Sequence, residues 1–130
     1  MRTPAAALVR SDFLRAPVLW TARPDGYKEW HHFVVHRAGL RLLVNFSLMC
    51  ETLPGRPPLL VPRVIVIAHE ERWTGAVARF TEAPEVSADF ATLTVGPNRM
   101  SLRPDGYRLV VELADRGISG ELHLQPSGRP

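Results

Sequence analysis

The feature that most constrains the fold of this chain is a series of short apolar runs in which residue types alternate. Between Leu40 and Glu51 every second residue is apolar. The chain has 12 prolines and 9 glycines, many of which lie between such runs. Period-two alternation bounded by Pro and Gly is typical of β-strands, whereas helical periodicity is weak. Strands are therefore predicted over residues 28–36, 40–51, 63–69, 73–81, 90–95, 99–103, 107–113 and 118–125, with a short edge strand over 17–22.

Most of the connections between these predicted strands are tight turns, and loops are predicted over residues 52–62 and 82–88. The expected fold is thus an all-β antiparallel meander. Closure of a meander into a barrel removes its edge strands, and an eight-stranded barrel can hold one small ligand, as in lipocalins. We expect a lipocalin-like barrel of about eight strands in a single domain over residues 17–126. Residues 1–16 are predicted to form an N-terminal arm, and residues 127–130 a frayed tail.

The charge pattern favours a mixed, solvated surface. Hydrophobic residues make up 45% of the 130 residues and charged residues 22%, with a formal net charge of +3. These values are typical of a globular domain. Nucleic-acid binding requires cationic side chains gathered on one face or element. The arginines are instead scattered singly among acidic residues, so a nucleic-acid partner is not expected.

Cysteine usage and hydropathy predict a cytoplasmic protein. Cys50 is the only cysteine, which excludes an internal disulfide and fits a reducing compartment. No apolar segment reaches the length that spans a bilayer. The N-terminal apolar run stops at Arg10 and is too short for a secretory signal.

The segment from Lys28 to His36 indicates a pocket. It combines a carboxylate, two aromatic rings and three imidazoles in one predicted strand. Polar groups in a hydrophobic strand are costly to bury without a partner. Trp30 and His32 share one face of this strand, and Glu29, His31 and Phe33 share the other. Two adjacent histidines on opposite faces of a half-buried sheet predict that one of them faces inward.

The next predicted strand has one continuous apolar face and one mixed face. The mixed face includes Asn45, Ser47 and Met49. These side chains either face solvent or line a pocket as hydrogen-bonding groups among apolar neighbours. His69 ends the β-branched run of residues 63–69, which is either buried on both faces or lines a cavity. We include it among the candidate ligand-binding residues.

The sequence contains no motif typical of a metal or cofactor site. His32 and His36 share a strand face, but four residues of extended chain separate them by roughly 13 Å. That distance is too long for one ion, and no ligand-spacing motif accompanies them. There is no Gly-x-Ser-x-Gly elbow and no glycine-rich phosphate loop. No metal and no cofactor are therefore predicted.

The run from Arg23 to Phe33, followed by a hairpin into Leu43-Val-Asn-Phe-Ser-Leu48, resembles the start of the CrtC/AttH-like family of lipocalin-like carotenoid 1,2-hydratases (hydroxyneurosporene synthases). Glu29, Trp30 and Phe33 match the Glu-Trp-Trp-Tyr-Phe motif of that family, while His31 and His32 replace its aromatic pair. Residues 107–126 resemble the end of the first domain. The resemblance therefore covers the N-terminal half of such proteins. It implies a second lipocalin-like half as partner, self-association, or a minimal single barrel that works alone.

The resemblance implies an apolar polyene or polyketide ligand in secondary metabolism. A hydratase would use His31, His32 or Glu29 to move a proton, and Trp30 or Phe33 to stabilise a carbocation. A Diels–Alder-type cyclase would fold its substrate in a shaped cavity. Two alternatives stay open: a non-catalytic small-molecule carrier or sensing module, and a protein-interaction β-domain without a ligand.

Overall fold

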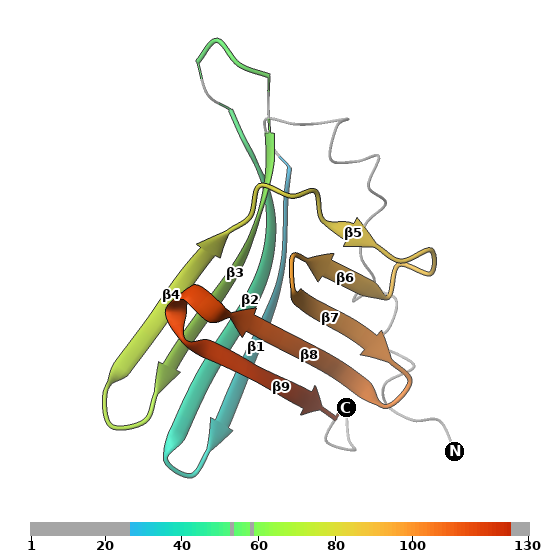
Figure 1. Cartoon of the computed structure of the whole chain (residues 1–130). Helices are drawn as coiled ribbons and strands as arrows, with labels where there is room; N and C mark the ends of the chain where they lie inside the picture. Colours follow the sequence, from blue (N-terminus) through green and yellow to red (C-terminus); the bar gives the residue numbers. More distant parts are fainter. Residues whose placement is uncertain (1–26, 53, 58, 126–130) are drawn as a thin grey trace. The chain divides into compact units, whose positions relative to one another are not determined.

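The computed structural model describes residues 27–52, 54–57 and 59–125. Within these ranges the chain forms strands and one short 3-10 helix, and no α-helix (Figure 1). The first sheet contains β1 (Lys28–Arg37), β2 (Leu40–Glu51), β3 (Leu59–His69) and β4 (Trp73–Arg79). The second contains β5 (Glu85–Val86), β6 (Thr92–Val95), β7 (Asn98–Arg103), β8 (Gly106–Leu113) and β9 (Ile118–Leu124), with the 3-10 helix η1 (Ala114–Arg116) between β8 and β9.

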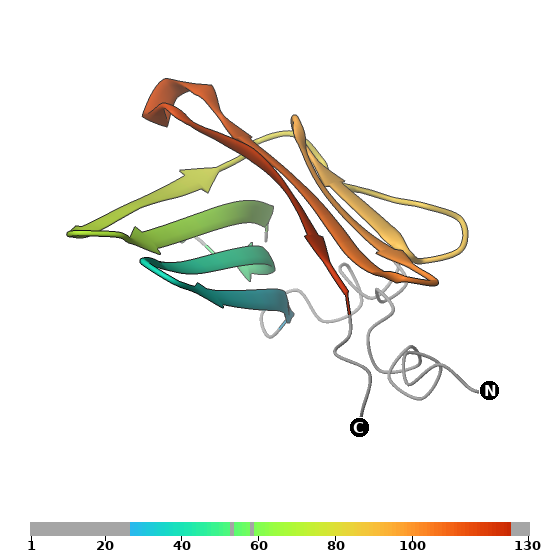
Figure 2. The ribbon, with the colours of Figure 1, turned by 90° about the horizontal axis from the view of Figure 1, so that it is seen from below.

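The predicted all-β antiparallel meander is confirmed. In each sheet every strand pairs with the next strand in the chain, and all of these pairs are antiparallel. The same strand order is visible from two directions in Figures 1 and 2. The described strands form two separate ladders of four and five strands, and no closed barrel is detected among them.

The described residues belong to two compact units, which divide between Ala83 and Pro84. The predicted arm (1–16), the predicted edge strand (17–22) and the predicted tail (127–130) lie outside the described residues. The single domain over residues 17–126 stays a prediction. In the part of the chain that the structure describes, no helix has the length and apolar character needed to cross a membrane.

The first sheet has two chemically different faces, because successive side chains of a strand point to opposite sides. We call them the Phe46 face and the Ser47 face. Val44, Phe46 and Leu48 lie on the Phe46 face, and strand pairing aligns Phe46 with Val64. All four side chains are at most 2% exposed. The Phe46 face is therefore the buried apolar side of this sheet.

The start of β3 corrects the predicted loop over residues 52–62. The strand begins at Leu59 and includes Pro62, although proline cannot donate a ladder hydrogen bond. The carbonyl of Pro62 accepts a hydrogen bond from the Phe80 amide at 2.9 Å. The nitrogen of Pro62 therefore also points towards the β4 side, where the ladder ends at the Arg63–Arg79 pair. Pairing of β3 with β2 loses no donor, so the strand extends past the proline.

The second sheet also has one apolar face, which contains buried side chains from β6, β7 and β8 such as Leu93, Met100 and Leu109. Asn98 is fully buried there. Its amide donates to the Val95 carbonyl at 3.2 Å and accepts from the Glu112 amide at 2.7 Å. These bonds satisfy a polar group that would otherwise be costly to bury.

The predicted loop over residues 82–88 contains β5, a strand of two residues. Its turn into β6 is closed by hydrogen bonds of the Ser87 main chain to Thr92 and Phe90. Hydrogen bonds from the Ser87 hydroxyl and the Ala91 amide lower the pKa of the Asp89 carboxyl below its ordinary value. Local polar side chains thus hold a strand that is too short to show an alternating pattern.

Candidate functional site

The Ser47 face of the first sheet contains a hollow of about 500 Å³. Its described lining comes from the three strands β1, β2 and β3 and consists of Lys28, Trp30, His32, Asn45, Ser47, Met49, Arg63 and Ile65. All of these residues belong to one compact unit. A polar floor within a partly apolar wall is typical of small-molecule sites.

Strand register explains why the sheet is hollow at this point. Ser47 of β2 pairs with Trp30 of β1 on one side and with Arg63 of β3 on the other. A small side chain thus lies between two long ones, and the space above it is unfilled. Ser47 is only 6% exposed, whereas Trp30 is 59% exposed. Ser47 therefore forms part of the floor of the hollow, and Trp30 forms a wall.

Asn45, which is buried, and His32, which is exposed, form the second polar feature of the hollow. The Asn45 Nδ2 donates to His32 Nδ1 at 3.1 Å. In this arrangement a neutral His32 has its proton on Nε2 and presents it as a donor. Asn45 is only 6% exposed, and its Oδ1 has no hydrogen-bond partner among the described residues. Turning the amide over would pair the oxygen with His32 but leave the nitrogen unmatched, so one end of the amide lacks a partner in either orientation.

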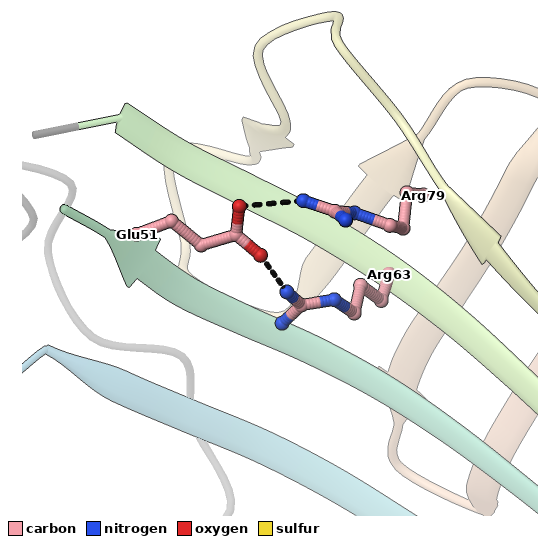
Figure 3. Close-up of polar contacts among 3 residues, drawn as sticks. All are labelled: Glu51, Arg63 and Arg79. Atoms are coloured by element: carbon pink, nitrogen blue, oxygen red, sulfur yellow. Dashed lines mark hydrogen bonds and ion pairs between the residues drawn. The ribbon is translucent and has the colours of Figure 1, made fainter. Parts of the chain in front are cut away.

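Cationic side chains lie on both sides of Ser47. The Lys28 ammonium lies 4.1 Å from the centroid of the Trp30 ring, a cation–π contact. Across the sheet, Glu51 forms ion pairs with both Arg63 and Arg79, at 2.5 Å for Arg79 (Figure 3). The side chain of Arg63 is 14% exposed and that of Arg79 57%. The Arg63 pair is therefore the less screened of the two.

The other predicted proton-transfer residues lie on the Phe46 face. Glu29 accepts a hydrogen bond from the Tyr27 hydroxyl at 2.6 Å and lies 3.5 Å from His31 Nε2. Both side chains are largely buried, at 11% and 13% exposure. The predicted set of Glu29, His31 and His32 is therefore divided between the two faces of the sheet.

The predicted ligand-binding residues are divided in the same way. Trp30, Asn45, Ser47 and Met49 line the hollow, whereas Phe33 lies on the opposite face. His69 shares the Ser47 face but packs against Trp73, with ring centroids 4.5 Å apart. It is four residues from Ile65 along β3, or roughly 13 Å. Within the described residues no group of three or more His, Cys, Asp or Glu side chains is placed to hold a metal ion.

Sequence reasoning missed three residues of the lining, namely Lys28, Arg63 and Ile65. The alternation along the β-branched run places Arg63 and Ile65 on one face of their strand. Which face of β2 they join depends on strand register. The pairing of Ser47 with Arg63 and of Asn45 with Ile65 brings both residues to the hollow.

The Glu51 ion pairs allow a test of this arrangement. Glu51→Gln removes the carboxylate shared by two guanidinium groups and leaves the partly buried Arg63 without its ionic partner. We expect the free energy of unfolding, measured by urea denaturation, to fall by about 1–2 kcal/mol. The control is Glu121→Gln, which breaks the exposed pair with Arg108 and should cost under about 0.5 kcal/mol. Equal losses in the two variants would contradict a distinct role for Glu51.

Comparison of the chain with models of protein families, with curated proteins and with solved structures finds no match. The resemblance to the carotenoid 1,2-hydratases is therefore still a prediction.

Proposed function

We propose that this protein binds an apolar small molecule in the hollow on the Ser47 face. The observation that most supports the proposal is the unmatched end of the Asn45 amide at the floor of this hollow. An unsatisfied buried polar atom costs about 1–3 kcal/mol. A ligand group that pairs with the amide when the Asn45 side chain shifts or turns over recovers part of this cost, so the site favours a ligand with a hydrogen-bonding group.

The remaining lining supports the apolar part of the proposed ligand. Trp30, Met49 and Ile65 surround the polar floor. A volume of about 500 Å³ lies within the usual range of small-molecule sites, about 300–1,000 Å³. Methionine adapts its shape to irregular ligands, and the indole ring offers a flat surface for a conjugated one.

The proposal extends to a lipocalin-like barrel, as the resemblance implies. Of the three candidate proton-transfer residues, only His32 lines the hollow. In a hydratase, His32 would therefore exchange the proton, and Trp30 would stabilise the carbocation by cation–π attraction. In a cyclase, Asn45 and Ser47 would polarise a carbonyl group by hydrogen bonding. A carrier or sensing module would use the same contacts without turnover.

Filling the hollow tests the binding proposal. Ser47→Trp places an indole in the space above the floor and should weaken binding of the neutral fluorescent probe N-phenyl-1-naphthylamine at least tenfold. The matched control is Arg41→Trp, an exposed position on the same strand and face. It should bind the probe as the wild type does. Circular dichroism checks that both variants fold. Equal affinity of folded Ser47→Trp and wild type would refute binding in the hollow.

A second candidate function, self-association, is favoured by exposed apolar side chains on the same face. Val34, Ile67, Trp73 and Val77 are between 38% and 63% exposed. Pairing places Ile67 beside Leu43, which in turn pairs with Val34. Monomeric soluble proteins rarely expose large contiguous apolar patches, and such patches often mark interaction sites.

Self-association through this patch is tested by sedimentation equilibrium. Trp73→Arg puts a charge within the patch and should raise the dimer dissociation constant about tenfold or more. Arg72→Ala, an exposed change at the neighbouring turn, should leave this constant unchanged. A wild-type protein that stays monomeric at all concentrations would exclude this second function while leaving ligand binding unaffected.

A further inference from the structure

We propose that the ligand of the hollow is an amphipathic carboxylic acid whose carboxylate lies between Lys28 and Arg63. This inference rests on the proposed binding function and adds the charge of the ligand. Its basis is the composition of the lining, which includes two cationic side chains and, among the described residues, no acidic one. Beyond their contacts with Trp30 and Glu51, these two cations would have no part in binding an uncharged ligand.

The register places Arg63 beside Ser47, and Lys28 beside Met49 on the same face. Trp30, Ser47 and Arg63 form a row across three adjacent strands, which spans about 10 Å at the usual strand spacing. Lys28 belongs to the same face of β1 as Trp30, and its ammonium lies over the Trp30 ring. Lys28 and Arg63 thus belong to the two strands that flank β2, and both line the hollow. The Ser47 hydroxyl offers a third donor from below.

Glu51 does not neutralise this group of charges. Its one carboxylate is shared between Arg63 and Arg79, and Lys28 is a third cation beside the hollow. The net charge of the group is therefore positive. A guanidinium has five N–H donors, and the ion pair of Arg63 with Glu51 is made through one terminal nitrogen. Arg63 thus retains donors for an anion while Glu51 holds its side chain in place.

The apolar residues of the hollow favour a hydrocarbon chain as the uncharged part of the ligand. Met49 and Ile65 lie on the same face as Ser47, on β2 and β3 respectively. A hydrocarbon chain that leaves the carboxylate can contact these side chains and the Trp30 ring. A small inorganic anion would leave this apolar surface in contact with water, which is unfavourable. The lining therefore favours an alkyl or alkenyl carboxylate over phosphate or sulfate.

The experiment compares two ligands that differ only in the charged end. Decanoate and 1-decanol are titrated against the protein with bound N-phenyl-1-naphthylamine, and displacement of the probe gives each affinity. We expect decanoate to bind at least fivefold more tightly than 1-decanol, and the difference to shrink at high salt. Lys28→Gln, an exposed change that keeps a polar side chain, should weaken decanoate binding about fivefold and so reduce the preference for decanoate over 1-decanol.

The controls separate failure of this inference from failure of the proposed function. Arg41→Gln removes an exposed cation from the same face outside the hollow and should affect neither ligand. Equal affinities for decanoate and 1-decanol, or equal decanoate affinity of Lys28→Gln and wild type, would overturn the anion site while small-molecule binding stands. Absence of displacement by both ligands, together with unchanged probe binding in Ser47→Trp, would overturn the binding function itself.

Discussion

The pairing of β2 with a strand on each side is the constraint on which the rest of the first sheet depends. β2 forms a ladder with β1 from Met49 to Leu40 and with β3 from Arg41 to Glu51. Because side chains alternate between faces, this double pairing determines which residues of three strands meet. A shift of one residue would exchange the two faces of a strand. It would remove Trp30 and Arg63 from the sides of Ser47 and eliminate the hollow.

The division into two faces also decides which chemistry is available to a ligand. Glu29 and His31, which are adjacent in space, lie on the Phe46 face with Tyr27. His32 lies on the Ser47 face with Asn45. A ligand in the hollow can reach only the second group. The adjacent histidines, which look equivalent in the sequence, therefore have different partners and different uses.

The strand pattern was largely predictable, whereas the site was predictable only in part. Alternation gave the type and position of the longer strands, and it showed that Trp30 shares a face with His32 and Asn45 with Ser47. Alternation did not predict that β3 includes Pro62. A strand tolerates proline where the proline nitrogen points away from a paired strand, and composition does not reveal that direction. Alternation failed at Arg63 and Ile65 because their place beside β2 depends on register. The Glu51 ion pairs link three strands, and no local sequence pattern predicts them.

We expect the ligand to bind at the Ser47 face of the first sheet and not at the Phe46 face. The most direct test is a methyl-labelled NMR titration with N-phenyl-1-naphthylamine. We expect the largest shift changes at the Met49 and Ile65 methyl groups, with small changes at the Val44 and Val64 methyl groups of the opposite face. Shifts concentrated at Val44 and Val64 would contradict the account, because the ligand would then occupy the Phe46 face.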